Sequence, residues 1–268
     1  MSTSLNAGQT THDELASVDE GAAADDRSRM SFLEHLDEFR RRLIYSVYAL
    51  VASCAVTLFY WDRLFKYYVE YLHANGGTLV YNQPMGGFMF SMKVSLLAGV
   101  IVASPFIFSQ FWLFVAPGLY AKEKRVVVPF VIFASLFFFG GAYFAHRVAF
   151  PGMVTFFASY QMYGLNYFPN LDDIFGLYVK VILGMGLVFQ MPMLVFFLAR
   201  FGVITAAFMI KQFKYAILII FIVAAVITPT SDPVNLMIFA GPMCGLYLLS
   251  IGVAWLFGKK KKDSTAGA

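Results

Sequence analysis

The sequence predicts an all-α polytopic membrane protein, and its composition and hydropathy pattern are the observations that predict this class. Apolar residues make up 59% of the 268 residues, whereas charged residues make up only 13%. A soluble domain carries roughly 25% charged residues, so an ordinary soluble fold is excluded. The mean hydropathy is +0.68, and the apolar residues gather into long segments separated by short polar ones.

Six apolar segments are expected to cross the bilayer as helices, within a membrane domain that covers residues 30–258. A hydrocarbon core of ~30 Å needs ~20 helical residues. The fifth segment has only thirteen residues and Gly241-Pro242 interrupts the sixth, so we expect short fifth and sixth spans and a concave bundle. The spans are expected at about 43–61, 88–115, 126–146, 174–199, 215–227 and 235–257.

Polar segments flank and connect these spans. Residues 1–29 are rich in Ala, Ser, Thr, Asp and Glu and are expected to form a disordered acidic tail, and residues 259–268 form a basic tail. We expect an amphipathic loop at about 62–84 and an irregular loop at 150–173. The first thirty residues lack the apolar core of a signal peptide, so the first span is expected to direct insertion.

The basic residues lie predominantly on one side of the predicted spans. Only Arg63, Lys66 and Arg147 fall on the other side. Cytoplasmic loops carry the excess of Lys and Arg, so both termini are predicted to be cytoplasmic. The fifteen residues on the cytoplasmic side are Arg27, Arg29, Arg40, Arg41, Arg42, Lys122, Lys124, Arg125, Arg200, Lys211, Lys214, Lys259, Lys260, Lys261 and Lys262.

The sequence lacks the motifs of the common enzyme classes. Its four histidines are scattered and match no zinc-binding spacing, and both cysteines lie in apolar segments. It has neither a nucleophile elbow nor a phosphate-binding glycine loop. We therefore expect no catalytic residue, no metal site and no cofactor.

A secondary transporter of a small solute is the alternative function. Ionisable residues inside spans usually mark a transport path, and such carriers place coupling sites near the bilayer midplane. The predicted spans contain only Lys93 and Lys180, each near the outer end of its span. This pattern argues against a small-solute carrier.

The segment at 31–43 precedes the first span and has the pattern of an amphipathic helix. Ser31 and Glu34 have the spacing of a capping box, and we expect the helix that they begin to lie on the membrane surface. Glu38 lies among arginines on its charged face. It either forms part of a docking site or pairs with Arg42 four residues away, a contact that stabilises a helix by about 0.2–0.5 kcal/mol.

A second carboxylate, Glu123, is predicted on the same cytoplasmic side, in the connector between the second and third spans. Pro117 is typical of a turn, and Leu119 and Tyr120 can anchor that turn at the membrane interface. Carboxylates held on rigid connectors can each accept paired hydrogen bonds from a guanidinium. A peptide with adjacent arginines is the ligand that Glu38 and Glu123 would bind.

Two further polar residues have both a structural and a functional interpretation. Gln190 lies deep in the fourth span, where an amide needs a partner in the bundle or water in a cavity. An interhelical hydrogen bond would be sufficient to explain it. Asp232 lies in the outer turn between the fifth and sixth spans, where capping the sixth span is a sufficient structural explanation.

Several motifs in order resemble the TatC family, the core component of the twin-arginine protein translocase. The resemblance implies a receptor for twin-arginine signal peptides of folded proteins in the bacterial inner membrane. It also implies assembly with TatA-type and TatB-type single-span partners in an oligomeric complex, transport driven by the proton-motive force, and no nucleic-acid partner. The motifs are HLDEFR at 35–40, SPFIFSQFWLFVAPGLYAKEKR at 104–125, FP at 150–151, FQMP at 189–192 and TPTSDP at 228–233.

The resemblance also implies roles for single residues. Glu38 and Glu123 match the carboxylates that contact the paired arginines, and Asp232 matches the acidic residue of the last outer turn. Gln190 stands where the family often has a glutamate, and an amide cannot titrate. In a third hypothesis the chain is only an assembly hub, and both carboxylates form interfacial pairs. The motif positions around the carboxylates are matched by Arg40, Phe114, Pro117, Leu119 and Tyr120.

Overall fold

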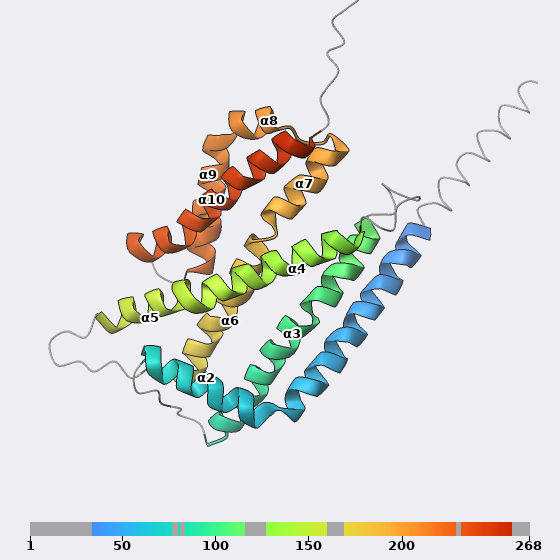
Figure 1. Cartoon of the computed structure of the whole chain (residues 1–268). Coiled ribbons are helices and arrows are strands. Elements are labelled where there is room, and N and C mark those ends of the chain that lie inside the picture. The colour runs from blue at the N-terminus through green and yellow to red at the C-terminus, as the bar shows by residue number, and fades with distance from the viewer. Residues whose placement is uncertain are drawn as a thin grey trace, which may run out of the picture.

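The computed structural model describes residues 34–76, 80, 84–115, 127–159, 169–228 and 232–258. In these ranges the chain is a bundle of helices (Figure 1), which confirms the predicted all-α class. The predicted tails at 1–29 and 259–268 lie outside the described residues. In chain order the helices are the first helix Glu34–Phe59, α2 Trp61–Gly76, α3 Gly86–Val115, α4 Val127–Phe144, the π-helical turn η3 Ala145–Ala149, α5 Phe150–Ser159, α6 Leu171–Val188, α7 Met191–Phe201, α8 Ala206–Lys211, α9 Phe213–Ile227 and α10 Pro233–Phe257.

Five described helical segments are long and apolar enough to cross a membrane, and they correspond to the predicted first four spans and the sixth. α9 is short, as predicted for the fifth span: its 15 residues rise about 22 Å, less than the ~30 Å of the hydrocarbon core. The prediction of a short sixth span was wrong, because α10 has 25 residues and continues through Pro242. Phe239 and Met243, on either side of the proline, are both buried.

The first helix is one continuous element that packs along α3. Ser53 Oγ donates to the carbonyl oxygen of Gly99 at 2.6 Å, and Thr57 Oγ1 donates to that of Ser95 at 2.8 Å. The expectation of a separate helix lying on the membrane surface was therefore wrong. No glycine or proline occurs between Glu34 and Ser53, so the charged segment continues directly into the span.

The segment predicted as an amphipathic loop contains a helix, α2. Asp62 in its first turn pairs with Lys66 one turn later, with 2.8 Å between the carboxylate and the ammonium. Tyr68 and Leu72, one turn apart, are both buried against the bundle. The prediction of a loop was wrong because these apolar residues recur with helical spacing, and burying them stabilises the helix.

The third span also extends beyond its predicted end, through η3 and α5. The expectation of an irregular loop from residue 150 was wrong for residues 150–159, and residues 160–168 lie outside the described ranges. In η3 the Phe150 N–H donates to the carbonyl oxygen of Ala145, five residues earlier. This wider turn directly precedes Pro151, which has no N–H to donate, so the chain passes the proline without leaving the helix.

The π-helical turn places His146 among tyrosines at the end of the bundle covered by α2. His146 Nδ1 lies 2.9 Å from the Tyr178 hydroxyl, and its ring stacks on Tyr71 with 4.0 Å between centroids. The Tyr71 hydroxyl donates to the His146 carbonyl oxygen. Burial raises the pKa of Tyr71, so this hydroxyl stays a neutral donor. The cluster ties α2 to η3 and α6.

Two glycines allow α4 and α6 to cross in close contact. A Cβ atom at Gly141 would lie 2.6 Å from the Met185 carbonyl oxygen, and one at Gly186 would lie 2.6 Å from Cε2 of Phe138. Small residues permit membrane helices to approach each other closely. Gly141 and Gly186 therefore set the separation of the two helices.

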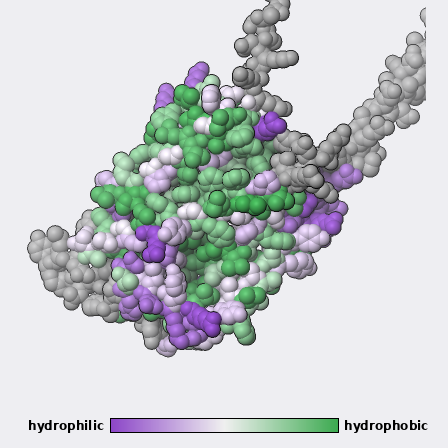
Figure 2. Space-filling view, viewed as in Figure 1, coloured by the Kyte–Doolittle hydropathy of each residue, from purple (hydrophilic) through white to green (hydrophobic). Residues whose placement is uncertain are grey.

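The surface of the bundle matches a membrane environment. Figure 2 shows hydrophobic residues across the middle of the viewed face, and hydrophilic residues gathered near α2 and near the start of the first helix. Phe59, Val226 and Trp255 are among the large apolar residues that are most exposed. Such exposure is costly in water but favourable where the neighbouring molecules are lipids.

We expect Gly141→Ala to destabilise the fold, because the added methyl group meets a backbone oxygen that cannot rotate away. Overpacking of this kind costs about 1–3 kcal/mol of unfolding free energy. Gly140→Ala is the matched control, since a Cβ there would lie 4.0 Å from the nearest atom, on Phe189. Thermal unfolding of both variants in one detergent tests this, and equal midpoints would contradict it.

Candidate functional site

The N-terminal end of the first helix holds Glu38 and Arg42 against each other. Arg42 Nη2 donates to Glu38 Oε1 at 3.1 Å. The arginine side chain is 26% exposed and the glutamate side chain 32%, so the pair is half-buried. The i,i+4 contact that the sequence offered as one alternative is therefore present.

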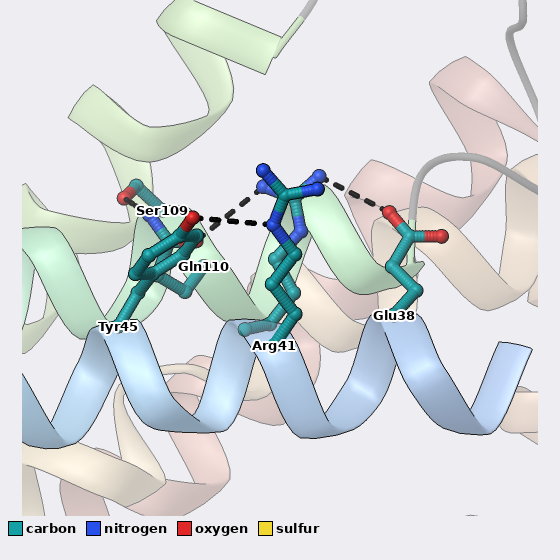
Figure 3. A network of polar contacts seen from close by, with 6 residues as sticks. Glu38, Arg41, Tyr45, Ser109 and Gln110 are labelled. Carbon is teal, nitrogen blue, oxygen red and sulfur yellow. Dashed lines mark hydrogen bonds and ion pairs between the residues drawn. The ribbon is translucent and has the colours of Figure 1, made fainter.

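Arg42 also reaches across to α3. Its Nη1 donates to Oε1 of Gln110 at 3.3 Å, and Gln110 is only 7% exposed. The Gln110 amide nitrogen lies 3.4 Å from the Ser109 hydroxyl and donates to it. One guanidinium thus connects a carboxylate of the first helix to an amide of α3, and Figure 3 labels Glu38 and Gln110, the two ends of this contact.

Arg41, the neighbouring cation, has a separate partner. Its Nε donates to the Tyr45 hydroxyl at 3.2 Å, and its guanidinium carbon lies 5.6 Å from the centre of the Tyr45 ring. Charged side chains of both signs therefore surround a pocket here, which suits a cationic or zwitterionic ligand. The pocket has a volume of about 450 Å³ and is lined by Asp37, Glu38, Arg41, Arg42 and Tyr45.

Aromatic rings join the first helix to the end of α3. The His35 ring stacks on Phe114 with 4.6 Å between centroids, and the Phe39 ring lies 5.1 Å from that of Phe114. Phe114 therefore lies beside the helical turn that carries Glu38, and its role in binding a peptide stays a prediction. Arg40, the other described motif residue, is exposed.

The remaining predicted residues of this site lie in the connector between α3 and α4, outside the described residues. The proposed pairing of Glu123 with Glu38 around one ligand therefore stays a prediction. The same holds for the roles of Pro117, Leu119 and Tyr120.

Gln190 stands at the break between α6 and α7. Its side chain is 6% exposed, and its amide nitrogen donates to the Ala134 carbonyl oxygen of α4 at 2.8 Å. Its Oε1 is buried and has no hydrogen-bond partner within the described part of the chain. The interhelical hydrogen bond considered from the sequence is therefore present, and it fastens α4 to the break.

Asp232 caps α10. Its Oδ2 accepts from the Asn235 backbone N–H at 2.7 Å, and its Oδ1 accepts from the Asn235 side-chain amide at 3.1 Å. Asn235 is fully buried, so the carboxylate also satisfies a polar group that water does not reach. The capping role expected from the sequence is present.

Neither a metal site nor a small-solute transport path gains support from the described residues. Within the described ranges, no three His, Cys, Asp or Glu side chains gather as a metal site would require. Lys93 pairs with Asp172 at 2.8 Å and so joins the start of α3 to the start of α6. One of the two lysines considered for a transport path thus has a structural partner.

Gln110 is the site residue that sequence reasoning missed. A signal was available: Gln110 and Phe114 are four residues apart and so share a helical face. A glutamine in an otherwise apolar span must also find a partner, because unpaired amides are costly in the membrane. What the sequence could not indicate was that the partner is Arg42.

The fold and this site define a class, a multi-pass helical membrane protein with a charged pocket at the end of its first helix. Comparison with known proteins then identifies the family. The family model described as Sec-independent protein translocase protein (TatC) matches residues 34–242. The chain belongs to the TatC family, as its motifs had indicated. It is accordingly a protein translocase component of the inner membrane and not an enzyme.

Individual relatives agree along most of their length. A Sec-independent protein translocase protein TatC of Koribacter versatilis is 41% identical over 239 residues, which cover 87% of this chain and 88% of the relative. One of Helicobacter pylori is 38% identical over 232 residues, covering 86% and 91%. A crystal structure of the twin-arginine translocase receptor TatC has a TM-score of 0.71 at 30% identity, covering 82% of this chain and 97% of that one.

We expect Asp232→Ala to lower the unfolding free energy by about 1 kcal/mol, because the first turn of α10 loses its cap. Asp232→Asn keeps an acceptor oxygen for the Asn235 N–H but not a second one for the buried Asn235 side-chain amide, so it should lose less stability than Asp232→Ala. Thermal unfolding of the two variants in detergent measures both effects. Equal losses in both would contradict the stabilisation of this turn by the cap to the Asn235 N–H.

Proposed function

We propose that this chain is the receptor and core scaffold of a twin-arginine translocase, and that it binds twin-arginine signal peptides of folded proteins beside Glu38. One observation carries this assignment: the half-exposed Glu38 carboxylate already accepts a hydrogen bond from a guanidinium, at the edge of an open pocket. An arginine of a peptide presents the same group. The solved structures that the chain resembles are of the twin-arginine translocase receptor TatC.

The peptide would be held by two carboxylates and one aromatic surface. Glu38 would take one arginine and Glu123 the other, because carboxylates accept paired hydrogen bonds from the planar guanidinium fork. Phe114, which contacts the turn of Glu38 through His35 and Phe39, would cover the apolar part of the peptide. Arg40, Pro117, Leu119 and Tyr120 would complete the site.

The site would face the cytoplasm, with both termini on that side of the inner membrane. The distribution of Lys and Arg supports this orientation, because fifteen of the 20 lie in the segments assigned to the cytoplasm. TatA-type and TatB-type single-span proteins would assemble with the chain in an oligomeric complex. The proton-motive force would drive transport.

Reversing the charge of either carboxylate should abolish peptide capture. We expect Glu38→Lys and Glu123→Lys to reduce crosslinking to a twin-arginine peptide by on the order of tenfold or more, because each loses a charge-assisted hydrogen bond. The measurement is photo-crosslinking of a labelled peptide to the full chain in inner-membrane vesicles. Glu70→Lys is the matched control, since it makes the same change at an exposed carboxylate of α2.

Membrane insertion of every variant is checked by its yield in washed membranes. Capture that persists in both Glu38→Lys and Glu123→Lys, at normal yield, would contradict the assignment of the site. Loss of capture in Glu70→Lys as well would mean that the peptide responds to overall charge rather than to these two residues.

A further inference from the structure

We propose that Arg42 is an internal occupant of the Glu38 site, and that Gln110 receives Arg42 when a peptide arginine takes its place. The proposal rests on the proposed function, since it concerns the regulation of the same site. In the described structure the guanidinium of Arg42 uses two different nitrogens for two acceptors, Nη2 for Glu38 and Nη1 for Gln110. Arg42 is therefore already hydrogen-bonded to Glu38, which it would release, and to Gln110, which it would keep.

The geometry makes the exchange local. A guanidinium has five N–H donors in a fixed plane and remains charged at any physiological pH. To release Glu38, Arg42 gives up one hydrogen bond and keeps the other, so the cation is never left without a partner. Gln110 lies on α3 and is 7% exposed, and its position therefore changes little when the end of the first helix adjusts.

The Glu38–Arg42 pair is partly buried, so its strength lies between that of an exposed ion pair and that of a buried one, as an exchange requires. A fully exposed i,i+4 ion pair is weak, and a peptide would displace it without any receiving residue. A fully buried pair would hold its own arginine against most ligands, because breaking it leaves an unpaired charge out of water. Glu38 and Arg42, at 32% and 26% exposure, lie between these limits.

The second cation of the pocket has a hydrogen-bond partner other than Glu38. Arg41 is held by the hydroxyl and ring of Tyr45, one turn further along the helix. Of the two arginines that line the pocket, Arg42 is the one that donates a hydrogen bond to Glu38. A ligand thus competes with one defined guanidinium, and Gln110 decides how readily that guanidinium yields.

This arrangement predicts opposite effects for two substitutions at one residue. Gln110→Leu removes the acceptor that Arg42 would keep, so Arg42 binds Glu38 more tightly and the peptide binds more weakly, by on the order of fivefold. Gln110→Glu offers Arg42 a carboxylate and draws it from Glu38, so the peptide binds more tightly by a similar factor. Arg42→Gln removes the competitor and should also tighten binding.

The decisive variant is the double substitution Arg42→Gln with Gln110→Leu. If Gln110 acts only through Arg42, the double variant binds the peptide as Arg42→Gln does, and the fivefold loss disappears. The measurement is the Kd of a fluorescent peptide with two adjacent arginines, titrated onto the full chain in lipid nanodiscs. Arg63→Gln, which removes a charge from α2 at the other end of the bundle, is the control and should leave the Kd unchanged.

The outcomes separate this proposal from the proposed function. If Glu38→Gln binds the peptide as the parent does, the site assignment fails. If Glu38→Gln weakens binding but Gln110→Leu has the same effect with and without Arg42, the peptide site stands and the exchange is wrong. A thermal unfolding midpoint is recorded for each variant, and Gln110→Glu, with its opposite sign, supplies the test if Gln110→Leu does not fold.

Discussion

A chain that crosses a hydrocarbon core must satisfy its backbone hydrogen bonds internally, and the irregular features of this fold are responses to that constraint. η3 carries the third span past Pro151 by shifting the bonding pattern to the fifth residue, so that helix continues on both sides of the proline. At the junction of α6 and α7 the backbone bonds stay local, since the Gln190 N–H donates to the Leu187 carbonyl oxygen at 3.0 Å in a tighter turn. The Gln190 side chain adds a bond across to α4.

The same constraint explains how the helices touch each other. Lipid provides no hydrophobic drive for apolar side chains to associate, so close packing and interhelical hydrogen bonds hold the bundle together. Gly141 and Gly186 supply the close packing between α4 and α6, and Ser53 and Thr57 supply hydroxyl donors between the first helix and α3. The Glu38 pocket and the Lys93–Asp172 pair, by contrast, both lie at helix ends.

The parts of the fold that the sequence could predict are those governed by local composition. Long apolar segments predicted the spans and the short α9, and the capping chemistry of Asp232 was recognisable from its place before Pro233. α2 and α5 were missed because their polar and proline residues resemble those of loops, whereas their stability comes from contacts with distant parts of the chain, such as that between Tyr71 and His146. Gln110 was missed for the same reason, since its partner is 68 positions away.

The sequence presented Glu38 as either a ligand-binding carboxylate or the partner of its own neighbour, and the structure makes these two descriptions compatible. A carboxylate that is to bind a guanidinium would carry a desolvation cost if it stood unpaired in a half-buried position. A neighbouring arginine one turn away removes that cost in the unliganded state. It also makes binding an exchange of similar groups, in which the number of charged hydrogen bonds to Glu38 is conserved.

Selectivity then depends on how well the incoming group reproduces a guanidinium, and a weakly directional ammonium would replace Arg42 less effectively. An intramolecular pair at this position is therefore compatible with a guanidinium-selective site and does not argue against one.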